Sequence, residues 1–330
     1  MMWYARKILM KKAKQKLFPT IRKTKIEEIK ISLDNIRVAP SPRFSISDLA
    51  RQTCVACGKS DIEILRYPAF KSQVFAGLVL ASCKICGFAW VPIPKFPLDD
   101  YYKHHYADDF RVERVINAKF YSPENPIWTL STHKVRDRAK RHVKALEVLG
   151  PVKRVLDLGA GEGLFLHFFD ADEKHAVEPD KNSVRILKTE LNVSVEALGD
   201  RTDYFDLVQC SHTLEHFTYD NIREILEKTL RTLRPGGHFH IEVPRGAVQL
   251  AHFTAGKRGR THRLEPHTLF YSTESLLNLL DQAGFDIKEA SVCGWPRPST
   301  SLKKLQKRYP ETALMQTPWL TVLARRPQRG

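Results

Sequence analysis

The stretch VLDLGAGEGLFL, residues 155–166, decides how the rest of the chain is interpreted. An apolar run ends at the acid Asp157, and glycines follow on alternate positions, at Gly159, Gly161 and Gly163. A glycine-rich turn directly after a strand allows a ligand to approach the backbone, because no Cβ stands in the way. In open α/β sheets, ligands lie beyond the carboxyl ends of the strands, which is where such a turn falls. The stretch therefore predicts a strand, a ligand-binding turn and a helix.

The same residues distinguish between two kinds of cofactor. The dinucleotide fingerprint GxGxxG needs a third glycine where Leu164 stands. A carboxylate at Asp157 repels a pyrophosphate and suits a cationic ligand. Glu178 closes the next predicted strand, HAVE at residues 175–178, and a carboxylate there can accept hydrogen bonds from both hydroxyls of a ribose. As purely structural residues, Asp157 would stabilise the turn and Glu178 would face the start of the next helix.

Beyond residue 131, apolar patterns typical of strands and of helices alternate. Strands are predicted at residues 155–158, 175–178, 205–210, 238–243, 287–292 and 319–324. Helices are predicted at residues 135–149, 164–169, 181–190 and 222–233, with one more capped by Ser272 and ended by Gly284. This alternation predicts a mostly parallel sheet covered by helices on both faces.

Five segments, taken in order, resemble the successive motifs of class I S-adenosylmethionine-dependent methyltransferases. They are VLDLGAGEG, HAVEPD, FDLVQCSHTLEHF, LRPGGHFHIEVP and LEPHTLFYSTESLLNLLDQAGF. The resemblance implies an α/β fold with a seven-stranded, Rossmann-like sheet whose last strand runs antiparallel. It also implies S-adenosylmethionine as the cofactor and methyl transfer as the reaction.

The resemblance assigns roles to particular residues around the cofactor. The methionine part is lined by Asp157, Gly159 and Gly161, and Ala160 of the same turn also binds the cofactor. Glu178 holds the ribose, Pro179 lies beside the adenine, and Ser211 lies near the reacting end. The acid that follows the third strand in this family has Asp200 as its candidate here.

Four of the six cysteines form two CxxC-Gly pairs, Cys54 with Cys57 and Cys83 with Cys86, and 25 residues separate the pairs. Each pair can fold as a knuckle, and two knuckles give a four-thiolate zinc site that is structural because no coordination position stays open. Four metal-free thiols, or two redox pairs, are the alternatives. Six cysteines in 330 residues are too few for a disulfide scaffold and indicate a reducing compartment.

These features predict four regions. Residues 1–50 form a basic arm, 51–98 a zinc ribbon, 99–130 a tyrosine-rich linker and 131–330 the methyltransferase domain. A zinc ribbon before such a core resembles a group of methyltransferases that act on sugars and polysaccharide intermediates.

The charge indicates a polyanionic partner. Lys and Arg number 53 against 37 Asp and Glu, a formal net charge of +16, and residues 1–30 hold ten basic residues and two acidic ones. Such an excess attracts a membrane surface, an acidic glycan or a nucleic acid. No apolar run reaches the roughly 18–20 residues that span a bilayer. The expected location is the cytoplasm, with the arm at the inner face of the membrane.

Methyl transfer to a hydroxyl needs in-line placement and a base. The candidate bases are His212, His216, His262 and His267. We favour His267, because related sugar enzymes carry a histidine in the corresponding motif. It is expected to overhang the carboxyl ends of the strands, whereas His216 is expected to lie deeper, against the cofactor loop. The nearby cations Lys257, Arg258, Arg260 and Arg263 would suit a phosphate-bearing acceptor.

The segment HTLEH, residues 212–216, also resembles the metal-binding motif of some quinone-pathway O-methyltransferases. That resemblance implies a catalytic Mg²⁺ held by His212, Glu215 and His216, as an alternative to a histidine base.

The predicted function is therefore methylation, most simply O-methylation, of a sugar, glycan or nucleotide-sugar acceptor. An RNA methyltransferase with a zinc module is one alternative. The net positive charge favours RNA as the acceptor, but the sequence lacks an NPPY-type pocket and an RNA-type catalytic cysteine motif. A quinone-type or other small-molecule O-methyltransferase is a second. A non-catalytic regulator that binds S-adenosylmethionine is a third, disfavoured by the complete glycine turn and by Glu178.

Overall fold

The structure, a computed structural model, describes residues 52–67, 79–92, 133–246, 248–249, 267–293 and 319–328. The predicted basic arm (1–50), the linker (99–130), His262 and the cations Lys257, Arg258, Arg260 and Arg263 lie outside the described residues. Among the helices of the described ranges, none is long and apolar enough to cross a membrane.

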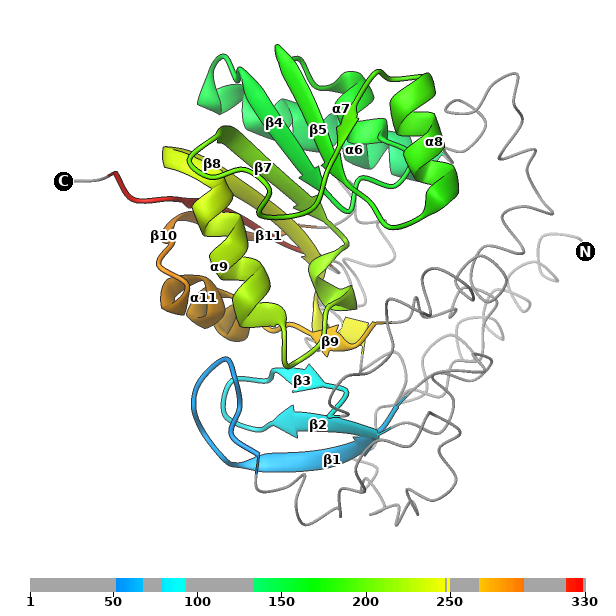
Figure 1. Ribbon diagram of the computed structural model, residues 1–330. Coiled ribbons are helices and arrows are strands. Elements are labelled where there is room, and N and C mark those ends of the chain that lie inside the picture. Colours follow the sequence, from blue (N-terminus) through cyan, green and yellow to red (C-terminus); the bar gives the residue numbers. More distant parts are fainter. Residues whose placement is uncertain are drawn as a thin grey trace, which may run out of the picture.

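A seven-stranded sheet forms the centre of the protein (Figure 1). Its strand order is β10 (Asp286–Cys293), β11 (Trp319–Arg325), β8 (Leu233–Pro244), β7 (Phe205–Ser211), β4 (Arg154–Leu158), β5 (Glu173–Val177) and β6 (Ser194–Val195). The last strand, β11, is antiparallel to both of its neighbours, β10 and β8, whereas β8, β7, β4, β5 and β6 pair in parallel. The predicted seven-stranded sheet with an antiparallel last strand is confirmed.

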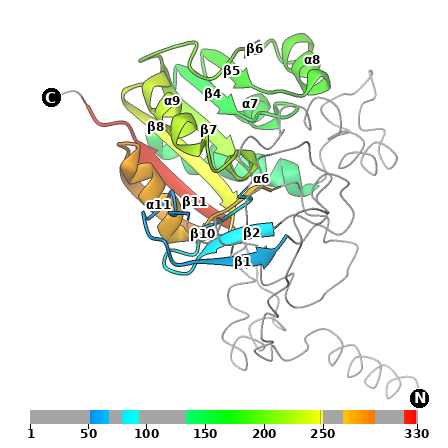
Figure 2. The same cartoon turned by 60° about the horizontal axis from the view of Figure 1, so that its bottom comes forward.

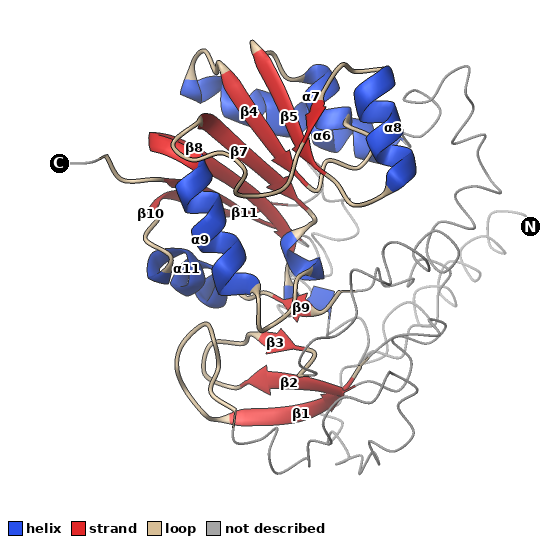
Figure 3. Ribbon diagram, viewed as in Figure 1, coloured by secondary structure: helices blue, strands red, loops and turns tan. Residues whose placement is uncertain are grey.

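Helices cover both faces of this sheet (Figure 3). They are α6 (His133–Leu146), α7 (Leu164–Phe168), α8 (Lys181–Thr189), α9 (Ile222–Thr232) and α11 (Thr273–Gln282), with short 3-10 turns η4 (Glu147–Leu149) and η5 (Leu214–His216). Successive residues of a strand point to opposite faces. Accordingly, Val155 of β4 packs with α6, α7 and α8, while its neighbours Leu156 and Leu158 pack with α9 and α11.

Side chains at the starts of two helices explain why these helices begin where they do. The Asp180 carboxylate accepts a hydrogen bond from the Ser183 amide at the start of α8. Ser272 and Ser275 form a reciprocal capping box at the start of α11, so the predicted cap at Ser272 is confirmed. Each cap satisfies backbone amides that have no partner inside the helix.

A second, four-stranded sheet combines the cysteine-bearing region with a strand from the methyltransferase region (Figures 1 and 2). Its order is β1 (Ile62–Arg66), β2 (Val79–Cys83), β3 (Ala89–Trp90) and β9 (Leu269–Phe270), all antiparallel. The ladder continues beyond β3, where the Val91 amide donates to the Thr268 carbonyl at 2.9 Å. The boundary predicted at residue 98 separates the cysteine-bearing region from the later regions in sequence. In the structure, β9 of the methyltransferase region joins β1–β3 in one sheet.

Side chains extend this junction onto α9 and α11. Trp90 stacks on Tyr219 with ring centroids 4.9 Å apart, and the Tyr219 hydroxyl donates to the Thr53 carbonyl. Arg223 donates to the Val55 carbonyl at 2.7 Å, and Gln282 donates to the Ala56 carbonyl at 2.7 Å. The four-cysteine region thus shares a core and a set of hydrogen bonds with the helices that follow β7 and β9.

Loss of the cysteine cluster should therefore loosen β9 as well as the ribbon. We expect Cys83→Ser to increase amide hydrogen exchange in β1–β3 and in Leu269–Phe270, because β9 pairs with β3. Amides of β5 should keep their protection, because that strand pairs only with β4 and β6. Exchange measured by mass spectrometry tests this. Unchanged exchange in β9 alongside a melted ribbon would show that the shared ladder does not couple them.

Candidate functional site

The glycine turn after β4 adopts backbone conformations that favour glycine. Gly159, Gly161 and Gly163 have φ angles of 78°, 54° and 77°. A Cβ on Gly159 would stand 2.1 Å from Oγ1 of Thr213, so only glycine allows the turn to lie against the segment after β7. A Cβ on Gly161 would meet nothing within 4 Å, so the space over this residue is open to a ligand.

Glu178 holds this turn in place. Its Oε2 accepts a hydrogen bond from the Gly161 amide at 2.7 Å, and its Oε1 accepts one from the Asp180 amide at 2.9 Å. A carboxylate oxygen accepts more than one hydrogen bond, so the same group can also receive ribose hydroxyls. Ala160 lies in the turn beside it, and Pro179, which follows Glu178, is exposed.

Asp157 lies at the inner side of the turn and is 4% exposed. Burial, together with the negative charge of Glu178, raises the pKa of Asp157 from 3.8 to about 8. A positively charged ligand beside this carboxylate would offset the cost of its buried charge. At the end of β7, the Ser211 hydroxyl is buried and has no hydrogen-bond partner among the described residues.

These features fit S-adenosylmethionine. Three features lie along the carboxyl edge of β4 and β7: the open space over Gly161, the buried carboxyl group of Asp157 and the unpartnered hydroxyl of Ser211. Glu178 flanks them at the end of β5. Asp200, the candidate for the acid after the third strand, is exposed, and its carboxylate accepts the Ala197 amide at 2.8 Å within its own turn.

A cluster of imidazoles and carboxylates follows the end of β7. The His212 ring lies between two buried acids, with Nδ1 3.4 Å from Oε1 of Glu215 and Nε2 3.4 Å from Oε1 of Glu242. Burial opposes ionisation of Glu242, but hydrogen bonds from His142 and His212 outweigh it and lower its pKa well below the usual range. Arg141 also donates to Glu242 at 2.6 Å. Glu242 is therefore ionised and paired.

Glu215 is the acid of the cluster that lies nearest to the two predicted catalytic histidines. It is 1% exposed, and Nε2 of His267 lies 3.9 Å from its Oε1. Burial raises the pKa of Glu215, but the His212 imidazole, whose Nδ1 lies 3.4 Å from Oε1, and the nearby rings of His267 and His216 outweigh this and lower the pKa below its usual value. The His216 and His267 rings meet edge to face, with centroids 4.9 Å apart. The sequence named Glu215 and His216 together, as ligands of a possible Mg²⁺, but did not indicate that His267 lies beside them.

His267 is the deeper of the two histidines, contrary to the expected order. His267 is 3% exposed, whereas His216 is half-buried. The pairing of β9 with β3 explains the difference, because it makes β9 a strand of the cysteine-bearing sheet. There, the Tyr67 hydroxyl donates to the His267 carbonyl at 2.6 Å, and the Gln249 amide nitrogen lies 2.7 Å from Nδ1 of the ring. No sequence motif pointed to Tyr67 or Gln249.

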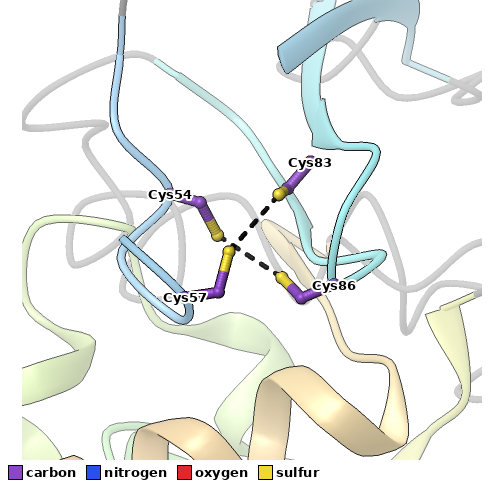
Figure 4. Close-up of side chains that lie close together, drawn as sticks. All are labelled: Cys54, Cys57, Cys83 and Cys86. Carbon is purple, nitrogen blue, oxygen red and sulfur yellow. Dashed lines mark hydrogen bonds between the residues drawn. The ribbon is translucent and has the colours of Figure 1, made fainter. Parts of the chain in front are cut away.

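The four cysteines converge as predicted (Figure 4). The Sγ atoms of Cys54 and Cys86 are 3.6 Å apart, as are those of Cys57 and Cys83, and all four lie within 4.8 Å of one another. A tetrahedral zinc ion with Zn–S bonds of about 2.3 Å needs sulfur atoms about 3.8 Å apart. The spacing and the donor set fit a structural zinc ion.

Both knuckles owe their shape to glycine. Gly58 and Gly87 each have a φ of 71°, and their amides donate to the carbonyls of Cys54 and Cys83 at 2.8 and 2.9 Å. Burial raises the pKa of the Cys54 thiol to about 12, a cost that a bound cation would offset by stabilising the thiolate.

Comparisons with known proteins agree with the fold. Residues 131–290 match the family Methyltransf_23, described as a methyltransferase domain. Together with the strand order, this match defines the class: the protein is a methyltransferase, and residues 131–290 carry its class I S-adenosylmethionine-dependent domain. A search of the curated proteins finds no match.

Solved structures with a similar chain course include several methyltransferases. A chain from the complex of the Haloferax volcanii Trm112 methyltransferase activator with a methyltransferase is 14% identical, with a TM-score of 0.43, and the match covers 60% of this chain and 96% of that one. The N-methyltransferase NodS of Bradyrhizobium japonicum WM9 is 15% identical, with a TM-score of 0.42 and coverages of 58% and 87%. An S-adenosylmethionine-dependent methyltransferase of Mesorhizobium loti is 21% identical, with a TM-score of 0.42 and coverages of 57% and 98%.

Glu178 should be the main determinant of cofactor affinity. Loss of a two-oxygen contact to a ribose costs on the order of 2 kcal/mol, so Glu178→Ala should weaken S-adenosylmethionine binding about 30-fold in calorimetry. Glu224→Ala serves as the control, because this acid is exposed on α9 and paired with Lys228, so its loss should change affinity less than about threefold. Equal affinities of wild type and Glu178→Ala in folded protein would refute the assignment.

The raised pKa of Asp157 predicts a pH dependence of both stability and binding. The folded protein without ligand holds the Asp157 proton more tightly than the unfolded chain, so this group costs stability as the pH rises from about 4 to about 8. A cationic cofactor favours the ionised form, so its affinity should rise between about pH 6 and about pH 8. Asp157→Asn should remove that rise, as measured by calorimetry at each pH. The assignment fails if both proteins show the same slope.

Proposed function

We propose that this methyltransferase transfers the methyl group of S-adenosylmethionine to a hydroxyl of a sugar, glycan or nucleotide-sugar acceptor. The observation that best supports this reaction type is the cluster of Glu215, His216 and His267 beside the glycine turn after β4. The link between the turn and the cluster is short, because Gly159 packs directly against Thr213, two residues before Glu215.

The cluster suits deprotonation of a weakly acidic acceptor. When bound, S-adenosylmethionine supplies an electrophilic methyl group on a sulfonium, which is a good leaving group. An acceptor hydroxyl then forms its O–C bond as the S–C bond breaks, and its proton passes to the cluster, at His267 or at the more exposed His216. Ionised Glu215 stabilises the imidazolium that results. A carboxylate acceptor would need no such group, so a buried imidazole–carboxylate cluster favours a hydroxyl.

The acceptor class rests on the domain combination and on the charge. A four-cysteine ribbon joined to a methyltransferase core resembles enzymes that act on sugars and polysaccharide intermediates, and the four thiols lie where a ribbon zinc would need them. The net charge of +16 supports an acceptor that bears phosphate, as nucleotide-sugars do. The same charge is the observation that favours RNA as the second candidate acceptor.

Release of S-adenosylhomocysteine tests the acceptor class. We expect turnover with members of a panel of nucleotide-sugars and sugar phosphates. Release with transfer RNA or with a quinol, and not with any sugar, would replace the proposal by one of the other acceptor classes. Binding of S-adenosylmethionine without turnover on any acceptor would favour a regulator.

Replacement of His267 should separate catalysis from cofactor binding. His267→Asn should lower kcat by about 10²- to 10⁴-fold, the usual contribution of a positioned proton acceptor, with little change in S-adenosylmethionine affinity. His216→Asn, measured in parallel on the same acceptor, shows whether the more exposed ring contributes. His240→Asn is the control, because His240 is buried on Gln209 in the interior of the sheet. Wild-type turnover by both His267→Asn and His216→Asn would remove the histidines from the mechanism.

A further inference from the structure

Three side chains of the cluster present the donor set of a metal site. One carboxylate oxygen of Glu215 and one ring nitrogen each of His216 and His267 lie within 4.8 Å of one another. Two donors on one zinc ion, with bonds of about 2.0–2.1 Å, lie about 3.3 Å apart in a tetrahedral site. The observed 3.9 Å between Oε1 of Glu215 and Nε2 of His267 needs only a small side-chain adjustment to reach that spacing.

The carboxylate of Glu215 lacks the hydrogen bonds that a buried acid normally has. The side chain is 1% exposed, and neither Oε1 nor Oε2 has a hydrogen-bond partner among the described residues. The imidazole of His212 approaches it, with Nδ1 3.4 Å from Oε1. A buried carboxylate without hydrogen bonds is costly, and coordination to a cation is one of the ways in which proteins offset that cost.

Gln249 supports the same inference. Its Nε2 lies 2.7 Å from Nδ1 of His267, and its Oε1 is buried without a partner among the described residues. A 180° rotation of the amide exchanges its two atoms, so that Oε1 of Gln249 accepts a hydrogen bond from Nδ1–H of His267 and the amide nitrogen takes the former place of Oε1. Nδ1 of His267 then carries the proton, and Nε2 of His267 directs its lone pair to the side of Glu215. Ligand histidines are held in this way by an acceptor behind the ring.

We propose that Glu215, His216 and His267 bind a divalent transition-metal ion, with Gln249 fixing the ring of His267. The donor set distinguishes this site from the Mg²⁺ site suggested by the sequence. Mg²⁺ prefers oxygen ligands, whereas two imidazoles and a carboxylate suit Zn²⁺, Fe²⁺ or Co²⁺. The structure also replaces one ligand, because His267 joins Glu215 and His216 while His212 bridges the two buried acids.

The ion would deepen the function proposed above, on which this role rests. Three protein ligands leave a coordination position open, as in catalytic zinc sites. An acceptor hydroxyl in that position would have a lowered pKa and would release its proton to water, before its oxygen attacks the methyl carbon. With the ion absent, the imidazoles keep their role as proton acceptors.

Cobalt titration of the full-length protein tests the site without any acceptor. We expect one Co²⁺ per chain in addition to the metal on the four cysteines, with visible bands of a nitrogen–oxygen site and no sulfur-to-metal charge-transfer band. Glu215→Gln and His267→Asn should each weaken Co²⁺ binding on the order of 100-fold. Gln249→Leu removes only the support behind the ring and should weaken it about 10- to 100-fold.

His212→Asn is the matched control, because Nδ1 of His212 lies 3.4 Å from Oε1 of Glu215, closer than the 3.9 Å of His267, yet His212 is outside the donor set. It should bind Co²⁺ within about threefold of wild type, and calorimetry with S-adenosylmethionine verifies that each variant is folded. The inference is overturned if wild type binds no Co²⁺ beyond the cysteine site, or if His212→Asn abolishes binding while His267→Asn retains it. Absent cobalt binding with a large kcat loss in His267→Asn would reject the metal and keep the histidine base, whereas cobalt binding without turnover on any sugar would reject the acceptor class.

Discussion

The close approach of Gly159 to Thr213 is the constraint on which the rest of the site depends. No side chain larger than hydrogen fits at this point, because a Cβ would stand 2.1 Å from the threonine hydroxyl. This contact brings the cofactor turn after β4 against the segment after β7. Glu178 then fixes the far side of the turn through the Gly161 amide. The glycine turn and the Glu215–His216–His267 cluster are adjacent because two strand ends of one parallel sheet are joined in this way.

The second determinant of the site is the strand that the cysteine-bearing region and the methyltransferase region share. β9 pairs with β3. Just before β9, the His267 carbonyl accepts a hydrogen bond from the Tyr67 hydroxyl, and the Thr268 amide donates one to the Glu215 carbonyl. His267 is thereby fixed on both sides: by the small sheet at its backbone and by the segment of Glu215 at its ring. A structural metal on the four thiols would stabilise this arrangement from a distance, without touching the cofactor.

The sequence predicted the parts of the protein that depend on local chemistry. Alternating strand and helix patterns predicted a mostly parallel sheet covered on both faces, and the resemblance to class I methyltransferases implied its seven strands. Ser272 predicted its helix cap, and the two CxxC-Gly pairs predicted the convergence of Cys54, Cys57, Cys83 and Cys86. The two-residue strand at Leu269–Phe270 could not be recognised, because so short a segment has no periodicity. Its pairing is decided by tertiary contacts, and the depth of His267 follows from that pairing. The contribution of Gln249 is equally invisible, since a lone glutamine forms no motif.

The proposed function requires that the Glu215–His216–His267 cluster faces the reacting end of the cofactor. A crystal structure of the complex with S-adenosylhomocysteine measures this directly. We expect the ribose hydroxyls to lie on Glu178 and the thioether sulfur to point toward the cluster, with room for one acceptor group between them. A sulfur that points away from the cluster, with the ribose bound elsewhere than on Glu178, would contradict it.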